Sequence, residues 1–96
     1  MAEVLHKAPE KIAAGNAETE MKLLEEAVSR AICEPEKRLI IDMAETRYLS
    51  SAGIRNLLTT FKRMRAAGGE FILRNVSSSV LEIINLTGIK NLIRIE

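Results

Sequence analysis

Two adjacent serines raise the first chemical question in this chain, within the stretch YLSSAGIRNLL that spans residues 48–58. A serine hydroxyl can act as a nucleophile when a base and an orienting group accompany it. His6 is the one histidine of the chain, and no G-x-S-x-G motif surrounds Ser51, so hydrolase chemistry is not expected. Ser50 and Ser51 also stand where a helical pattern begins, where a serine side chain commonly accepts hydrogen bonds from free backbone N–H groups.

The residues that follow the serines suggest a second role. One helix cap needs one hydroxyl rather than two, and Ala52 and Gly53 remove side-chain bulk from the first helical turn. The backbone there would be open to close approach by another molecule. The pattern therefore leaves two interpretations open, a structural cap and a contact surface for a partner.

Other kinds of site find less support in the sequence. Cys33, His6 and scattered carboxylates lack any metal-ligand spacing, and we expect Cys33 to be a small core residue near a helix end. Asp42 ends an apolar run, as a receiver-domain phosphate acceptor does, but Ala13-Ala14 cannot supply the acidic pair such sites need; loop hydrogen bonding is expected of it. Gly68-Gly69 follows a helical pattern without the Lys-Ser/Thr of a P-loop. No metal or cofactor is predicted.

Composition narrows the class of partner. The chain has 96 residues, 47% of them hydrophobic, and 14 basic against 13 acidic side chains give a formal net charge of +1. This balance does not favour nucleic acid or an anionic membrane. A single cysteine cannot form an internal disulfide, and no signal peptide or apolar membrane span is evident, so a cytoplasmic protein is expected. The length suits one domain over residues 1–96.

Hydrophobic periodicity predicts the elements that must position the serines. It indicates helices over 17–33, from the serines to Gly68, and from a start within Ser77 to Ser79 as far as Thr87. It indicates strands over 38–43, 71–73 and 91–95. Asn16 is the predicted N-cap of the first helix, and Ser79 with Glu82 has the spacing of a capping box before the third. Gly88 is placed to end that helix.

The order of these elements predicts the fold class. Residues 1–15 contain either two short strands around Pro9 or one poor strand, so the pattern is β-α-β-α-β-α-β. Right-handed crossovers then place helices against a single small, open, mostly parallel sheet in an α/β domain. The serines would lie at the carboxyl edge of this sheet, where such folds meet ligands and partners.

The sequence resembles the STAS domain of bacterial anti-sigma factor antagonists from "RLIIDMAETRYLSSAGIRNLL" through Gly68-Gly69 and the late "LTGIKNLIRIE", together with the preceding "GNAETEMKLLEEAV" helix. In that family a strand ending in Asp leads to an Asp-Ser-Ser/Thr-Gly-Leu motif at the start of a helix. With Gly53 on the motif glycine, Ser51 falls on the phosphorylated serine and Ser50 on the motif Asp. Ala52 falls on the second Ser/Thr, and Asp42 on the polar residue that ends the strand.

The resemblance implies a binding module without catalytic activity. The partner would be an anti-sigma factor that is itself a serine protein kinase, which phosphorylates Ser51, and a serine phosphatase would restore the free form. Ser50 is the alternative acceptor. The contact surface would comprise Asp42, Ser50, Ser51, Ala52, Gly53 and Arg55. Arg47 and Arg55 flank residues 48–53, which carry the two serines and are called the serine loop.

Two alternatives remain open at this stage. A STAS subunit could dock by the same face, without phosphorylation, onto the ATPase of a lipid-transporting ABC importer or onto a signalling assembly. A third class, a lipid or nucleotide site in a groove beside the second helix, has only the small residues in its favour.

Overall fold

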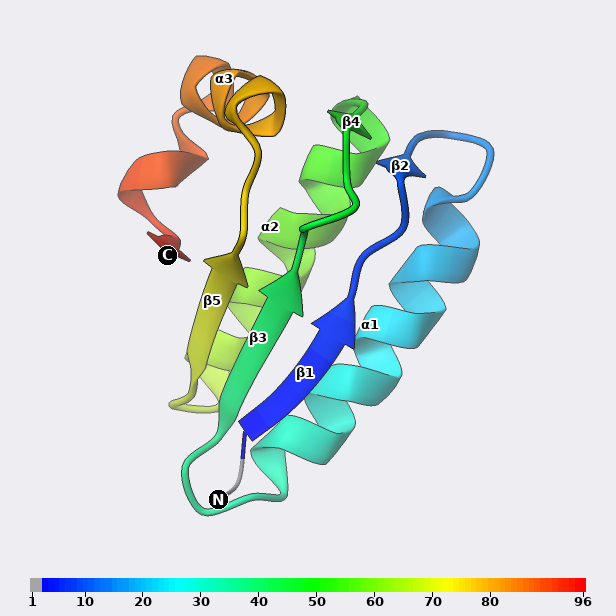
Figure 1. Ribbon diagram of the computed structural model, residues 1–96. Helices are drawn as coiled ribbons and strands as arrows, with labels where there is room; N and C mark the ends of the chain where they lie inside the picture. Colours follow the sequence, from blue (N-terminus) through cyan, green and yellow to red (C-terminus); the bar gives the residue numbers. More distant parts are fainter. Residues whose placement is uncertain (1–2) are drawn as a thin grey trace.

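The computed structural model describes residues 3–96 and shows a parallel sheet with two long helices against one of its faces (Figure 1). The sheet has four strands in the order β1-β3-β5-β6, and each neighbouring pair is parallel. This arrangement confirms the predicted α/β class. The elements are β1 (Glu3–Lys7), β2 (Lys11–Ile12), α1 (Ala17–Ile32), β3 (Arg38–Asp42), β4 (Tyr48–Leu49), α2 (Ser51–Ala66), β5 (Glu70–Arg74), α3 (Ser78–Thr87), the 3-10 turn η1 (Ile89–Asn91) and β6 (Arg94–Ile95).

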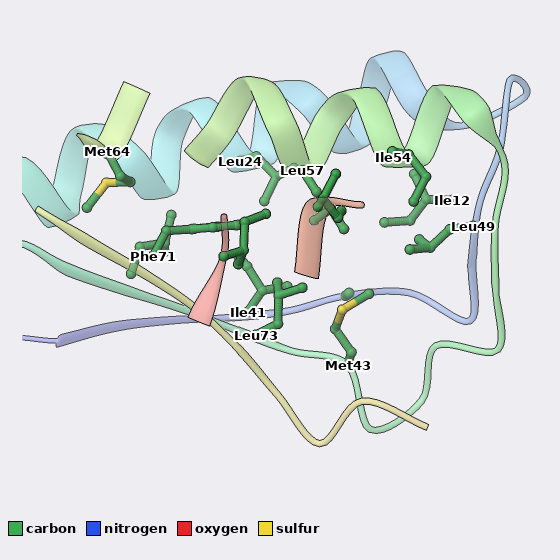
Figure 2. Close-up of a cluster of buried hydrophobic side chains, with 14 of the residues drawn as sticks. Ile12, Leu24, Ile41, Met43, Leu49, Ile54, Leu57, Met64, Phe71 and Leu73 are labelled. Carbon is green, nitrogen blue, oxygen red and sulfur yellow. The ribbon is translucent and has the colours of Figure 1, made fainter. Parts of the chain in front are cut away.

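The core lies between the sheet and helices α1 and α2. The central strands β3 and β5 are continuous apolar runs, and the three middle residues of each strand are buried. Their register places Ile41 beside Leu73, and both side chains point toward the helices. Figure 2 shows Leu24 of α1 and Leu57 and Met64 of α2 packed over these strands. Each of these five side chains is fully buried, so helix periodicity and strand burial agree.

Several predicted helix boundaries hold, and Asn16 is the N-cap residue of α1 as predicted, but its side chain does not cap the helix and the capping box of α3 is wrong. Asn16 occupies the N-cap position of α1 without capping it, because its Oδ1 accepts from Ala13 N at 2.9 Å instead. The helix α3 begins two residues earlier than the Ser79–Glu82 box requires, and Ser77 is its cap, accepting from Val80 N at 3.3 Å. The repeated serines allowed more than one register for the cap.

The two ends of the described chain fit the prediction unequally. Of the two alternatives for the N-terminal segment, the structure shows the pair of strands around Pro9, and β1 is a full member of the main sheet. The last strand is only Arg94–Ile95, because η1 and the turn that follows it take up residues 91–93 of the predicted strand. Cys33 is exposed beyond the end of α1, so the prediction that it is a core residue is wrong. Within residues 3–96, no helix combines the length and apolar character needed to span a membrane.

A buried polar pair joins β1 to α1 and was not predicted. His6 Nε2 lies 2.7 Å from Glu20 Oε2, and the two side chains are only 11% and 5% exposed.

We expect His6→Leu to lower the free energy of unfolding by about 3 kcal/mol, because it leaves a buried carboxyl group without its partner. The His6→Leu, Glu20→Leu double variant should recover most of this loss. Urea unfolding of the wild type, both single variants and the double variant measures the coupling free energy between His6 and Glu20. A His6→Leu variant as stable as the wild type would contradict the prediction.

Candidate functional site

The serine loop is held by a small second sheet above the carboxyl end of the main one. After β3 the chain passes through residues 43–47 and pairs β4 with β2 in parallel, with Tyr48 beside Lys11 and Leu49 beside Ile12 (Figure 1). Ser50 N then donates to Ile12 O at 2.9 Å. The serines therefore follow β4 rather than the buried strand β3 directly, and β2 fixes where α2 begins.

The two serine hydroxyls have different roles in the structure. Ser50 is the N-cap of α2, and its Oγ accepts from Ala52 N at 3.2 Å and Gly53 N at 3.4 Å. Ser51 is the first helical residue and is exposed. Its hydroxyl has no hydrogen-bond partner within residues 3–96. The structural cap is thus Ser50, and the hydroxyl available to another molecule is that of Ser51.

Gly53 is required by a contact inside the protein. A Cβ atom at this position would lie 2.6 Å from Ile12 O and 3.0 Å from Ile12 Cβ. Gly53 is buried against β2, whereas Ala52 is half-buried at the surface. The sequence suggested that the glycine opens the backbone to a partner, but its close neighbour is Ile12.

Asp42 connects two loops at the same edge, as loop hydrogen bonding predicted. Its Oδ1 accepts from Ala44 N at 3.0 Å and from Asn75 Nδ2 at 3.1 Å. These hydrogen bonds, the one from Ala44 N above all, lower the pKa of the Asp42 carboxyl below its ordinary value, with smaller contributions from Lys7 and Arg74. The bonds tie the β3–β4 loop to the β5–α3 loop.

This lowered pKa predicts a pH dependence of stability. The Asp42 carboxylate binds protons more weakly in the folded chain than in the unfolded chain, so its contribution is complete above the unfolded pKa near 3.8. The contribution is lost as the pH falls through the lower, folded pKa. We expect the stability difference between wild type and Asp42→Asn to shrink below about pH 4. Urea unfolding at several pH values between 3 and 7 measures this, and a constant difference would contradict it.

The other residues in or near the serine loop are Arg47, Arg55, Thr46 and Tyr48. Arg47 and Arg55 are exposed, and neither forms an ion pair in the described part of the chain. Thr46 is buried, and its Oγ1 donates to Pro9 O at 2.7 Å. Tyr48 is 51% exposed next to the serines. Sequence reasoning missed Tyr48, although its alternation with buried Leu49 on β4 is a signal that could have placed it at the surface.

The site is a surface rather than a cavity. No pocket and no group of three metal-ligating side chains is found among residues 3–96. The groove that a lipid or nucleotide would need beside α2 is therefore not seen in this part of the chain. The geometry exposes a free hydroxyl, an aromatic ring and two guanidinium groups at the surface.

Comparisons with known proteins agree with this fold. Residues 7–96 match the STAS domain family. A Bordetella bronchiseptica protein assigned as an anti-sigma factor antagonist, BtrV, is 31% identical over 65 residues, which are 68% of this chain. The chain spans 56% of the length of BtrV in that match.

Solved structures show the same fold at lower identity. A Thermotoga maritima protein assigned as an anti-sigma factor antagonist superposes with a TM-score of 0.82 at 16% identity, covering 98% of this chain and 78% of that one. A STAS domain protein of Planctomyces limnophilus gives 0.81 at 17%, covering 100% and 90%. A sulfate transporter family protein of Wolinella succinogenes gives 0.75 at 16%, covering 99% and 76%.

Proposed function

This chain belongs to the STAS domain family, and from that premise we propose that it is an anti-sigma factor antagonist whose binding is switched at Ser51. The unmodified protein binds an anti-sigma factor with its serine-loop surface, and a sigma factor is released as a result. The resemblance to BtrV supports the kind of partner. The main observation that supports the proposal is that the two serines have different roles. Ser50 caps α2, whereas Ser51 is exposed.

The position of Ser51 suits a phosphate. Oγ of Ser51 lies at the N-terminus of a 16-residue helix, where the helix dipole favours a negative charge. No acidic residue lies in the first turn of α2 to repel it. Because Ser50 alone accepts the capping hydrogen bonds, modification of Ser51 removes none of them. The fold therefore tolerates the modified state.

The same phosphate changes the contact surface. A phosphoryl group adds a charge of roughly −1.5 to −2 at pH 7. A partner that packs against Ser51, Ala52 and Tyr48 would have to desolvate that charge. Arg47 and Arg55 are free to pair with it and so hold it in place. Binding and phosphorylation then exclude one another.

The remaining parts of the cycle belong to other proteins. The anti-sigma factor is the serine protein kinase that modifies Ser51, and a serine phosphatase reverses the step in the cytoplasm. This chain acts as one domain and as a binding module with no enzymatic activity of its own. Ser50 is a poorer acceptor than Ser51, because its hydroxyl oxygen is held against two backbone N–H groups.

A second function is favoured by one feature of the sequence. Ser50 stands where antagonists carry an Asp beside the acceptor serine, so the carboxylate next to the phosphorylation site is absent. A STAS subunit that docks on a transporter ATPase through the same surface would need neither that carboxylate nor a phosphorylation cycle.

Affinity capture from the source bacterium tests the class of partner. The wild-type chain is the bait, and the control bait carries Ala52→Arg, which adds bulk to the proposed contact surface. Recovery of a serine-kinase anti-sigma factor by the wild type, reduced by Ala52→Arg, supports the antagonist. Recovery of a transporter ATPase instead would move the function to the second candidate.

A further inference from the structure

The outer edge of β1 is the longest strand edge without a partner in the described part of the chain. The strand β1 has five residues, stands at one end of the sheet order and pairs only with β3 among residues 3–96. An exposed edge of this kind is a template for pairing with another strand. We propose that a second copy of this chain pairs there in antiparallel fashion, with Leu5 on the twofold axis, and joins the two sheets into one.

The backbone N–H and C=O groups of β1 are oriented as this pairing requires. Ala8 N donates to Asp42 O at 2.9 Å, so the backbone groups of Ala8 face β3. Along a strand, the N–H and C=O groups of successive residues point to opposite sides, so Val4 and His6 also face β3. The N–H and C=O groups of Glu3, Leu5 and Lys7 therefore face away from β3, toward the open edge.

The side chains of Glu3, Leu5 and Lys7 can pair with the same three side chains of a second copy. They share the face of the sheet opposite His6, which contacts α1. Leu5 is 56% exposed, with Glu3 two residues before it and Lys7 two residues after it. An antiparallel pair centred on Leu5 sets Leu5 against its own copy and Glu3 against Lys7 at both ends. Opposite charges directly across strands stabilise such a pair.

Helix α1 places a second apolar group on the same side of the molecule. Glu25 of α1 lies 3.2 Å from Arg63 and so marks the side of α1 that faces α2. Leu23, two residues earlier, is rotated by about 200° around the helix and points away from α2. Its side chain is 45% exposed, and α1 is the helix that packs beside the β1 side of the sheet (Figure 1). The twofold axis at Leu5 brings the two α1 helices side by side, so the Leu23 side chains of the two copies approach one another, while the two Leu5 side chains meet on the opposite face of the sheet.

This dimer leaves the serine loops free. The strands of the two copies run in opposite directions, so the carboxyl edges of the two sheets, with Ser51 at each, lie at opposite ends of the joined sheet. The dimer does not depend on the proposed function. A failure to dimerise would not bear on partner binding at Ser51, and the converse also holds.

Sedimentation equilibrium of the purified chain over a range from micromolar to millimolar concentration tests the dimer. The wild type should approach twice the monomer mass as the concentration rises. Leu5→Lys should weaken dimerisation at least about tenfold, because it places two like charges on the axis. Leu86→Lys is the matched control, since Leu86 is 88% exposed on α3, and it should dimerise as the wild type does. Thermal unfolding of each variant verifies that the monomer folds.

Charge exchange gives a second, independent readout. Lys7→Glu alone should weaken the dimer, because it sets like charges across both ends of the pair. Adding Glu3→Lys should recover part of the loss, because it returns opposite charges across the strands but also removes the ion pair of Glu3 with Arg38, whose atoms lie 3.1 Å apart. Lys7 and its partner Glu45 are each 61% exposed, so the single change has little effect on the monomer. Monomer at every concentration, equal dimerisation by Leu5→Lys and wild type, or no rescue by the double exchange would each overturn the proposal.

Discussion

Ser51→Asp is expected to lose binding to the anti-sigma factor while keeping the wild-type fold and melting temperature. The carboxylate places a fixed negative charge where the partner otherwise meets a small neutral hydroxyl. Coupling of about 1 to 3 kcal/mol is usual between two linked sites, which is a factor of about 5 to 150 in affinity. Because an Asp carries less charge than a phosphate, we expect a loss toward the lower part of this range, about tenfold. Titration calorimetry with the purified partner measures the change.

Ser51→Ala is the matched control for this loss. It removes the acceptor without adding charge, so it should bind as tightly as the wild type and stay bound when ATP is added. Ser50→Ala separates the cap from the switch. That variant should lose about 1 kcal/mol of stability through the lost N-cap and keep its affinity for the partner. Equal affinities of Ser51→Asp and wild type would rule out a switch at this residue.

Gly53→Ala is expected to have the largest effect on stability among single changes in the serine loop. The added Cβ would meet a backbone oxygen, Ile12 O, at 2.6 Å. That oxygen also accepts from Ser50 N, so β2 cannot retreat without breaking the bond that positions α2. Overpacking of this kind costs about 1 to 3 kcal/mol, and the rigid backbone neighbour favours the upper end. Urea unfolding of the variant measures the loss.

Gly15→Ala is the control for that substitution. No atom lies within 4 Å of a Cβ built at Gly15, so the change should be close to neutral. If Gly53→Ala were as stable as Gly15→Ala, the contact with Ile12 would not explain the glycine. A partner contact would then be the better explanation of its small size.

The fold was predictable where apolar periodicity is strong. Leu39 to Ile41 and Phe71 to Leu73 are continuous buried runs, and the stripes on α1 and α2 follow a helical period. Such patterns determine element type and layer order because burial is the dominant favourable term in folding. Short or polar elements were not predictable in the same way. Strand β4 is two residues long, and its pairing with β2 depends on a tertiary contact that no local pattern encodes.

The candidate site was predictable in its location but not in its details. A serine pair before a helical pattern indicates a helix start, and the structure assigns the cap to Ser50. The reason for Gly53 lies in β2, and the pair formed by His6 and Glu20 joins residues 14 positions apart. Each of these depends on which segments meet in space. The exposed edge of β1 could not be predicted either, because the sequence did not determine whether residues 1–15 form one strand or two.

Mapping of phosphate on this chain after incubation with its anti-sigma factor and ATP tests the central claim most directly. Mass spectrometry of the peptide that contains Ser50 and Ser51, together with the mass of the complex before and after the reaction, is the measurement. The switch predicts one phosphate, on Ser51, and dissociation of the complex as it accumulates. Phosphate confined to Ser50, or a complex that persists after Ser51 is fully phosphorylated, would contradict it.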